Sequence, residues 1–236
     1  MTGNPNTAQV YVDIVCPWCY IGLRRLTAAL ALLPERDRPT IVWRSLELDP
    51  RSSRTPGEVA AEAMTRWWGA DAPARVARIQ ALGAADGLPL DLHRARPVNT
   101  FDAHRLLQFA AARGRAEPTL EALLRAYHTE GADLADRRLL ERVGVASGLP
   151  AAELAGVLAG DGYAETVRAD RRRAARHGVR GVPSVVVGDA PPVSAVQPAA
   201  ELARLLTPAG RAGADQGGAV RAGADQGGPD QAVRAG

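Results

Sequence analysis

The stretch QVYVDIVCPWCYIG occupies residues 9–22, and it decides the fold that the sequence predicts. Residues 9–15 are rich in β-branched and aromatic side chains, which is typical of a short buried strand and favours a parallel sheet. A Cys-Pro-Trp-Cys segment follows at 16–19, and Pro17 suits the first turn of a helix, where its missing N–H is not needed. Apolar residues then recur at helical spacing, and residues 40–48 have the composition of a second strand. The stretch therefore predicts a strand–helix–strand unit at the start of the chain.

The rest of the chain changes its pattern twice. Between residues 55 and 177, Ala, Arg and Leu recur at helical spacing with Gly and Pro between them, which predicts a block of helices. Strand character returns at 182–187 and more weakly at 192–196, before a closing helix at 198–206. The helices expected in the block cover residues 57–67, 73–85, 100–113, 118–129, 136–147, 151–158 and 162–177. This order is typical of a two-layer α/β sheet with helices inserted in its middle.

The sequence beyond residue 207 is of low complexity. The segment RAGADQGG at 211–218 recurs at 221–228, and large apolar side chains are almost absent. Such a segment cannot offset the conformational entropy that ordering would cost. We therefore expect residues 207–236 to form a disordered tail, with a repeat-dependent interaction segment as the alternative.

The composition excludes several classes of protein. Among 236 residues there are 29 Lys plus Arg, all of them Arg, and 26 Asp plus Glu, so the net charge of +3 is too small to argue for nucleic-acid binding. Two cysteines are too few for a disulfide-stapled scaffold or for a four-thiolate zinc site. No apolar run approaches the roughly 20 residues of a membrane span, and the polar start lacks the pattern of a secretory signal. We expect a cytoplasmic protein, whose thiols are kept reduced.

Cys16 and Cys19 are spaced so that their sulfurs meet across the first turn of the predicted helix. The free N–H groups and the dipole at the helix start favour the thiolate of Cys16. We expect Cys16 to be the exposed nucleophile and Cys19, one turn further in, to resolve the mixed disulfide. A structural or metal-binding pair is the alternative, but zinc would need two further ligands. The histidines lie singly at His93, His104, His128 and His177, so we expect no metal.

A second feature is the segment Gly181-Val182-Pro183 at the start of the late strand. Proline at the first position of a strand can follow a cis peptide bond, which is rare enough to indicate a special role. Combined with a Cys-x-x-Cys motif after the first strand, this Val-Pro pair resembles the thioredoxin fold, in which the proline sits beside the active-site disulfide.

Together the motifs resemble the DsbA family, in particular its FrnE-type branch, which is related to the 2-hydroxychromene-2-carboxylate isomerases and the kappa-class glutathione transferases. The resemblance covers about residues 8–206. It rests on the segments CPWCYIG at 16–22, PVNTFDAHR at 97–105, GVP at 181–183 and SAVQP at 194–198. Ser184 and Val185 after the proline, and Ala195, depart from the residues common in this branch, but none of these changes removes a thiol.

The resemblance implies an α/β, thioredoxin-like fold with a large all-helical insertion. Residues 8–50 and 178–206 would form the thioredoxin-like domain, and residues 51–177 would form the helical insertion domain. The partners expected are a disulfide-containing protein or a small thiol, without nucleic acid or membrane, and the chain would be a monomer or a homodimer.

The activity implied is that of a thiol–disulfide oxidoreductase or isomerase, with Cys16 as nucleophile, Cys19 as resolver and a cis Pro183. No metal or organic cofactor is expected, although a low-molecular-weight thiol could be a co-substrate. The alternative is a glutathione-transferase-like or 2-hydroxychromene-2-carboxylate-isomerase-like enzyme acting on a small thiol or on an aromatic or polyketide substrate. Kappa-class relatives usually carry Ser at the position of Cys16, so the full dithiol favours redox chemistry. A holdase or scaffold that uses the helical block is a third hypothesis.

Residues beside the cysteines have alternative roles. Trp18 adds no positive charge, so we predict a weaker oxidant than relatives with histidine in the motif, although Trp18 could equally be a hydrophobic lid. Asp13 could tune Cys19 or relay its proton, or it could cap a nearby turn. Pro17 and Val182 are candidate substrate-binding or tuning residues, because they adjoin the nucleophile and the proline.

The segment before the predicted 100–113 helix is a further candidate. Asn99 and Thr100, with Asp102 in the first turn, are typical of helix capping. The resemblance places this segment facing the active site, where it could contact a thiol substrate. His104 is expected to be a packing or surface residue rather than a base. Four arginines are expected to form a solvated helix face, or alternatively a docking site for an acidic peptide or small thiol: Arg171, Arg172, Arg173 and Arg176.

Overall fold

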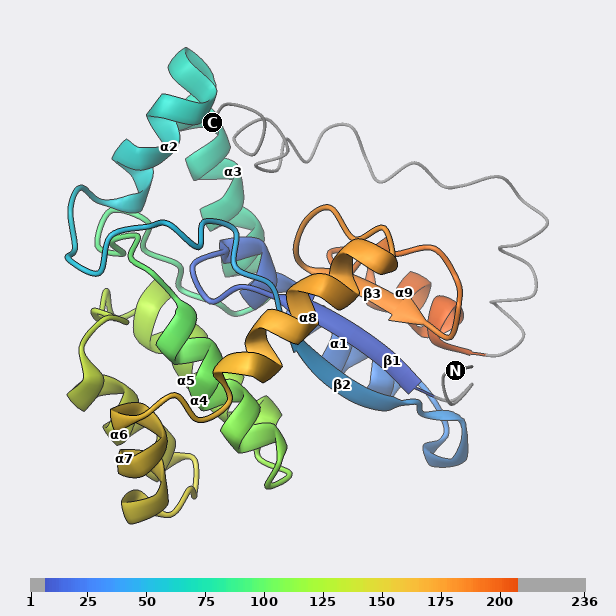
Figure 1. Ribbon diagram of the computed structural model, residues 1–236. Helices are drawn as coiled ribbons and strands as arrows, with labels where there is room; N and C mark the ends of the chain where they lie inside the picture. The colour runs from blue at the N-terminus through green and yellow to red at the C-terminus, as the bar shows by residue number, and fades with distance from the viewer. Residues whose placement is uncertain (1–6, 208–236) are drawn as a thin grey trace.

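A four-stranded sheet forms the centre of the computed structural model, which describes residues 7–207 (Figure 1). The strand order is β2-β1-β3-β4. β1 (Thr7–Val12) pairs in parallel with β2 (Thr40–Ser45), as the strand–helix–strand unit predicts. β3 (Ser184–Val187) is antiparallel to β1, and β4 (Val193–Ser194) is antiparallel to β3. This register brings the segment that follows β1 beside the segment that precedes β3.

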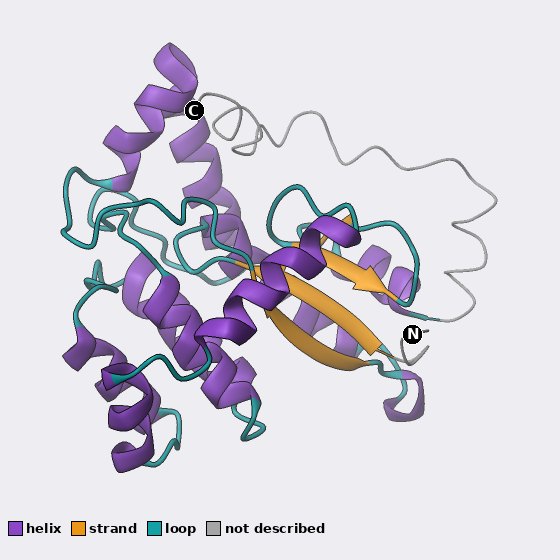
Figure 2. Ribbon diagram, in the orientation of Figure 1, coloured by secondary structure: helices purple, strands orange, loops and turns teal. Residues whose placement is uncertain are grey.

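Helices cover both faces of the sheet. α1 (Pro17–Ala31) and α9 (Ala199–Leu206) pack together behind it, and α8 (Ala164–Arg176) crosses its front (Figures 1 and 2). Under α8, the side chains of Tyr11 and Val186 pack against Ala174. The sheet is therefore the middle layer between helices on either side.

The remaining helices form a block beside the sheet (Figure 1). A single hydrophobic core joins this block to the sheet, because Val10 and Ile14 belong to the same buried cluster as Leu106 and Leu120. The helices of the block are α2 (Ala60–Trp68), α3 (Ala72–Ala85), α4 (Phe101–Ala111), α5 (Ala116–His128), α6 (Arg137–Ala146) and α7 (Ala151–Ala159). Short 3-10 turns lie at Glu35–Asp37 and Gly69–Asp71.

The ends of the first two strands differ from the prediction. β1 ends at Val12 rather than at residue 15, because the Cys16 N–H donates to the Asp13 carbonyl (3.2 Å) and closes a turn. β2 ends at Ser45 rather than at residue 48, because the Leu48 N–H turns to the Asp13 side chain (2.7 Å). In both places a contact of Asp13 replaces the strand pairing that the apolar sequence suggests.

The α/β class with helices inserted between β2 and β3 is confirmed. The division into 8–50 with 178–206 and 51–177 stays a prediction, and α8, which it assigns to the insertion, packs against the sheet. The tail expected at 207–236 lies outside the described residues, apart from residue 207. Within the described part of the chain, no helix is long and apolar enough to cross a membrane.

Candidate active site

The two cysteines lie at the start of α1, beside Pro183. Cys16 precedes the helix, and its carbonyl accepts the N–H of Cys19 (3.0 Å). Both are free thiols. The Cys16 thiol donates to the carbonyl oxygen of Val182 at 3.7 Å, and the Val182–Pro183 peptide bond is cis, as the family resemblance implies. Two motifs that are 166 positions apart thus meet at one end of the sheet.

Gly22 allows α1 to approach Pro183 closely. A Cβ at this position would lie 2.8 Å from Cγ of Pro183 and 3.3 Å from Cβ of Ala195. On its other side, the Pro183 carbonyl accepts the N–H of Ala195 (3.1 Å). Gly22 is therefore a site residue because it lacks a side chain, and its place in the 16–22 segment was the only signal of this in the sequence.

Cys16 is much less exposed than the sequence suggests. Only 3% of the residue is exposed, because it joins the hydrophobic core and Trp18 and Val182 pack against the same cluster. Cys19 is fully buried, as predicted. Burial raises the pKa of the Cys19 thiol well above its usual value, and the adjacent Cys16 and the charge of Asp13 contribute in the same direction. Reduced Cys19 is therefore a protonated thiol at neutral pH.

Asp13 connects Cys19 to the loop after β2. Its backbone N–H donates to Sγ of Cys19 (3.4 Å), and its carboxylate Oδ2 accepts the N–H of Leu48 (2.7 Å). Burial raises the pKa of this carboxyl, but hydrogen bonds from His104, Leu48 and Thr100 outweigh it, so the pKa lies below its usual value. Asp13 is therefore a buried carboxylate that ties down a loop and also lies beside the resolving cysteine.

His104 is buried, which agrees with a packing role, but its contact with Asp13 was not expected from the sequence. It is fully buried, and its Nε2 lies 3.2 Å from Oδ1 of Asp13. The other ring nitrogen, Nδ1, is buried without a hydrogen-bond partner among the described residues. Its place in the 97–105 segment was the only hint, since a single histidine on a helix has no pattern of its own.

His128 is a second histidine at the site. Its Nε2 donates to the Ile14 carbonyl (2.9 Å), two residues before Cys16. Burial lowers the pKa of His128 to about 4, so the ring is neutral at physiological pH. It fixes the turn that leads into the cysteine motif. The sequence shows only an isolated histidine near the end of α5.

Asn99 and Thr100 form hydrogen bonds to different parts of the structure. Asn99 Oδ1 accepts the N–H of Phe101 (3.1 Å) at the start of α4, and its Nδ2 donates to the Pro50 carbonyl (3.1 Å). Thr100 is buried and makes no capping bond with its side chain, but it hydrogen-bonds Asp13. Asn99 therefore caps the helix start as expected, whereas Thr100 supports the buried carboxylate.

The remaining candidates lie on different sides of the sheet. Pro17 is buried at the first position of α1, and Trp18 is half-buried and points into a pocket beside the motif. Among the predicted arginine cluster, Arg171, Arg172 and Arg176 are exposed, which agrees with a solvated face. These arginines belong to α8, which crosses the sheet face opposite α1 (Figure 1). The structure therefore does not bring the cluster to the cysteines.

The family of the chain follows from this arrangement together with its sequence. Residues 7–207 match the model of the DsbA-like thioredoxin domain. The chain belongs to this DsbA-like family. Its fold is the thioredoxin-like DsbA fold, as the resemblance implies. A search of curated protein sequences finds no match.

Three solved structures are similar to this DsbA-like chain. A structure described as a probable DsbA oxidoreductase from Streptomyces coelicolor is 38% identical with a TM-score of 0.80, over 86% of this chain and 89% of that one. A 2-hydroxychromene-2-carboxylate isomerase is 17% identical with a TM-score of 0.60, over 78% and 86%. The cytosolic disulfide reductase DsbM from Pseudomonas aeruginosa is 23% identical with a TM-score of 0.52, over 76% and 83%. The last two share the fold.

The described residues contain no group of three or more His, Cys, Asp or Glu side chains that could hold a metal ion. The expectation that the chain needs neither metal nor organic cofactor stays a prediction.

Proposed function

We propose that this chain is a thiol–disulfide oxidoreductase whose active site is the Cys16-Pro-Trp-Cys19 motif. The observation that carries the proposal is the pair of free thiols at the start of α1, with Sγ of Cys16 3.7 Å from the Val182 carbonyl beside the cis Pro183. Membership of the DsbA-like family supports the same class of reaction.

The first step belongs to Cys16. Its sulfur, as the thiolate, attacks one sulfur of a substrate disulfide. A Cys16–substrate disulfide forms, and the other substrate sulfur leaves as a thiolate that takes a proton from water. Val182 and Pro183 border Cys16, so they are placed to align an extended substrate beside it.

The second step belongs to Cys19. Its sulfur attacks Cys16 in the mixed disulfide, which forms the Cys16–Cys19 disulfide and releases the substrate as a thiol. Because burial keeps Cys19 protonated, this step needs a proton acceptor. We assign that role to the Asp13 carboxylate, which His104 positions from α4 (3.2 Å). The reverse sequence oxidises a substrate dithiol.

We propose that the chain acts in the cytoplasm on disulfide substrates. The DsbM enzyme is described as cytosolic, and the cytoplasm is where a dithiol of this kind is kept reduced. The substrate is a protein disulfide or a small disulfide, and the chain's own thiols replace a cofactor. Trp18 supplies no charge to the motif, so we expect a weaker oxidant than relatives with histidine there.

The test uses insulin reduction with the full chain and its cysteine variants. We expect Cys16→Ser to abolish activity and Cys19→Ser to accumulate a mixed disulfide with the substrate, detectable by mass spectrometry. Activity that survives Cys16→Ser would refute the proposal.

The isomerase or transferase alternative rests on a fold shared with 2-hydroxychromene-2-carboxylate isomerase at 17% identity. It predicts conjugation or isomerisation of an aromatic substrate that persists in Cys16→Ser, so the same variant separates the two functions.

A further inference from the structure

Helix α8 turns an arginine-rich face to the solvent. Residues 168–180 hold six arginines and a single acid, Asp170. Asp170 is buried and paired with an arginine of β2 (3.1 Å), so it does not offset the charge of the outer face. Arg168, Arg172 and Arg176 recur every four residues, which places them along one side of the helix, and all three are exposed. A line of positive charge therefore runs along the outside of α8.

This line of charge continues toward the cysteine motif. Arg180 is also exposed, in the loop that joins α8 to Val182, and the Val182 carbonyl accepts a hydrogen bond from the Cys16 thiol (3.7 Å). Val182 is six residues after Arg176, so their Cα atoms are at most about 22 Å apart. We define the basic stripe by its four residues: Arg168, Arg172, Arg176 and Arg180.

The charge of the basic stripe is poorly compensated within the described part of the chain. Arg172 pairs with an acid of its own helix, Glu165. Arg176 and Arg180 form no hydrogen bond or ion pair with the described residues, and the guanidinium of Arg168 lies over a phenylalanine ring of α4. Exposed charges of one sign attract a partner of the opposite sign. The basic stripe therefore suits an anionic partner.

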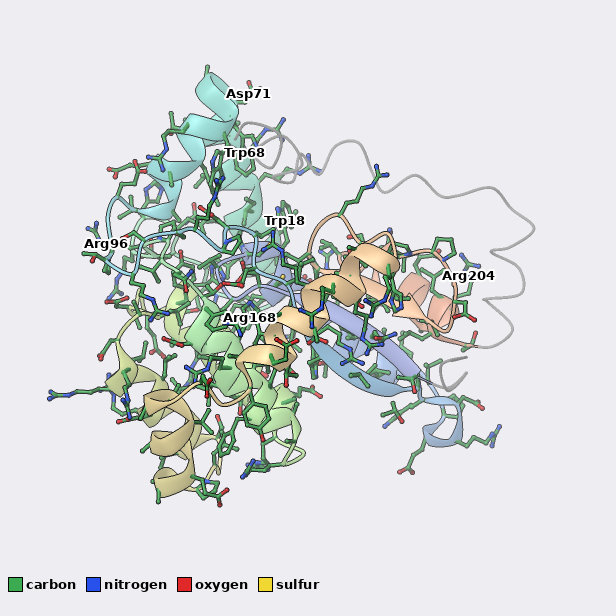
Figure 3. The ribbon with its side chains drawn as sticks, in the orientation of Figure 1. Trp18, Trp68, Asp71, Arg96, Arg168 and Arg204 are labelled. Carbon is green, nitrogen blue, oxygen red and sulfur yellow. The ribbon has the colours of Figure 1, made fainter. Side chains whose placement is uncertain are left out.

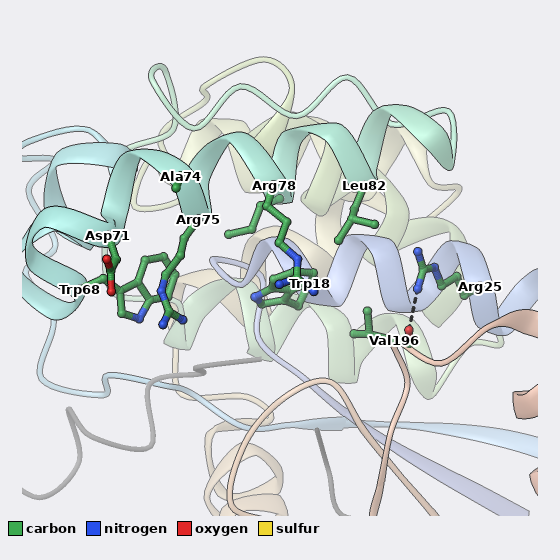
Figure 4. A pocket seen from close by; sticks show the side chains of 10 residues that line it. Trp18, Arg25, Trp68, Asp71, Ala74, Arg75, Arg78, Leu82 and Val196 are labelled. Atoms are coloured by element: carbon green, nitrogen blue, oxygen red, sulfur yellow. Dashed lines mark hydrogen bonds between the residues drawn. The ribbon is translucent and has the colours of Figure 1, made fainter. Parts of the chain in front are cut away.

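The position of the basic stripe limits the size of that partner. Figure 3 shows Arg168 on α8, apart from Trp18 of the cysteine motif. Trp18 instead lines a pocket together with residues of α3 (Figure 4). With 13 residues, α8 is about 20 Å long. A small disulfide at Cys16 is too short to span this helix as well, whereas a polypeptide segment can reach both.

The spacing of the arginines suits an extended acidic segment. Arginines four residues apart are displaced by about 6 Å along the helix axis. Alternate side chains of an extended chain are about 6.6 Å apart, so acids at every second position can meet successive arginines. Guanidinium groups form paired hydrogen bonds with carboxylates. A nucleic-acid strand would use the same charges, but it offers no disulfide to Cys16.

We propose that the basic stripe docks an extended acidic segment of a protein substrate whose disulfide is presented to Cys16. The inference rests on the proposed function and names its substrate class, which is disulfide-containing proteins with clustered Asp or Glu near a cysteine. The dithiol exchange itself is unchanged. The stripe adds binding that is equal before and during the reaction, so it lowers KM and leaves kcat as it is.

The first experiment measures docking without chemistry. In the full-length Cys16→Ser/Cys19→Ser protein, fluorescence anisotropy compares three labelled peptides of one length, in which every second residue of an extended block is Glu, Gln or Lys. We expect the Glu peptide to bind about tenfold more tightly than the Gln peptide at low ionic strength, and the Lys peptide to bind most weakly. Equal affinities, or a Glu preference that persists at about 1 M salt, would overturn the proposal.

A matched pair of variants locates the effect. Arg176→Gln/Arg180→Gln removes two exposed charges from the basic stripe, and Arg138→Gln/Arg142→Gln removes two exposed charges from α6. We expect only the first change to weaken binding of the Glu peptide, by about tenfold. Equal weakening by both changes would show a general effect of net charge and would also overturn the proposal. Stripe-dependent binding of a short DNA duplex that is tighter than binding of the Glu peptide would assign the stripe to nucleic acid instead.

The second experiment keeps docking and the redox function apart. The reduced full chain is given the Glu and Gln peptides with a disulfide-bonded cysteine seven residues from the block, because seven extended residues span about 22 Å. We expect KM to be about tenfold lower for the Glu peptide at a similar kcat, and the difference to vanish in Arg176→Gln/Arg180→Gln. Charge-selective binding without reduction of either peptide would support the stripe and refute the redox function. Reduction of both peptides with one KM would refute docking and leave the redox function standing.

Discussion

Two buried aspartates, Asp13 and Asp170, are held by the same two elements, and yet their acidities shift in opposite directions. Their side chains are 1% and 2% exposed. The end of β2 and the loop after it supply a backbone N–H to each, from Leu48 to Asp13 (2.7 Å) and from Ser45 to Asp170 (3.0 Å). Asp13 lies beside Cys19, whereas Asp170 joins α8 to the sheet. The two aspartates are therefore equally buried, but only Asp13 lies beside a cysteine of the motif.

Helix α4 also serves both carboxylates, with side chains one turn apart. His104 Nε2 lies 3.2 Å from Asp13, and Gln108 Nε2 donates to Asp170 (3.1 Å). Burial raises the pKa of both acids. At Asp13 the donors outweigh burial and the pKa is lowered, whereas at Asp170 burial outweighs the bonds from Ser45 and Arg44 and the pKa is raised. Two carboxylates of similar exposure thus have pKa shifts of opposite sign, because the balance between burial and hydrogen bonds differs between them.

The largest expected difference between the two acids is in turnover. Asn keeps the size of Asp but cannot accept the Cys19 proton, so we expect Asp13→Asn to slow release from the mixed disulfide by about 100-fold. The rate left in this variant should rise with pH, as Cys19 ionises without help. Asp170→Asn should change turnover less than about twofold, because this carboxylate touches only structural partners.

Single-turnover reduction of insulin, followed across pH, measures this difference. If Asp13→Asn and Asp170→Asn slow the second step equally, the contrast between a functional and a structural aspartate is wrong.

Much of this contrast could not be predicted from the sequence. The Cys16–Cys19 pair and Pro17 could be predicted, because consecutive residues along the chain are enough to indicate a strand that is followed by a helix start. Pro183 needed a second motif, and its meeting with Cys16 followed from the family resemblance. Asp13 stood out as an acid in an apolar strand, but both a tuning role and a capping role were open. The structure shows why: the same carboxylate receives a loop N–H and lies beside Cys19.

The contacts of His104 and Asp170 could not be predicted from the local sequence pattern. His104 meets Asp13 across 91 positions, and Asp170 meets Ser45 across 125. Asp170 sits in a helix among arginines, which is typical of a solvated face, and its burial depends on how α8 crosses the sheet. The early end of β1 was missed for a partly related reason, because the local turn closed by the Cys16 N–H and the Asp13 carbonyl is accompanied by a long-range bond from Leu48 to the Asp13 carboxylate.

A smaller effect is expected from the two α4 side chains. His104→Ala removes a hydrogen bond that lowers the pKa of Asp13, so this pKa should rise. The acid limb of the pH–activity profile should then move to higher pH, and turnover should fall by about tenfold. His104→Gln keeps an N–H donor and should recover most of the loss.

Gln108→Ala is the matched control on the same helix. It deprives Asp170 of a donor, so it should lower the free energy of unfolding by about 1–3 kcal/mol and leave the acid limb in place. A shift of that limb in Gln108→Ala equal to the shift in His104→Ala would mean that α4 acts on activity only through general stability.

The smallest expected effect is on the pH dependence of the free energy of unfolding, to which the two aspartates should contribute with opposite signs. The Asp13 pKa is lowered on folding, so its stabilisation is present above the usual carboxyl value of 3.8 and is lost as the pH falls through the folded value. The Asp170 pKa is raised, so stability is lost as the pH rises from 3.8 through its folded value. Urea unfolding should therefore show that the advantage of wild type over Asp13→Asn shrinks on acidification below about pH 4. For Asp170→Asn, the stability of wild type relative to the variant should instead increase on acidification toward pH 3.8. If the stability difference changed with pH in the same direction for both variants, the opposite pKa shifts of the two aspartates would be contradicted.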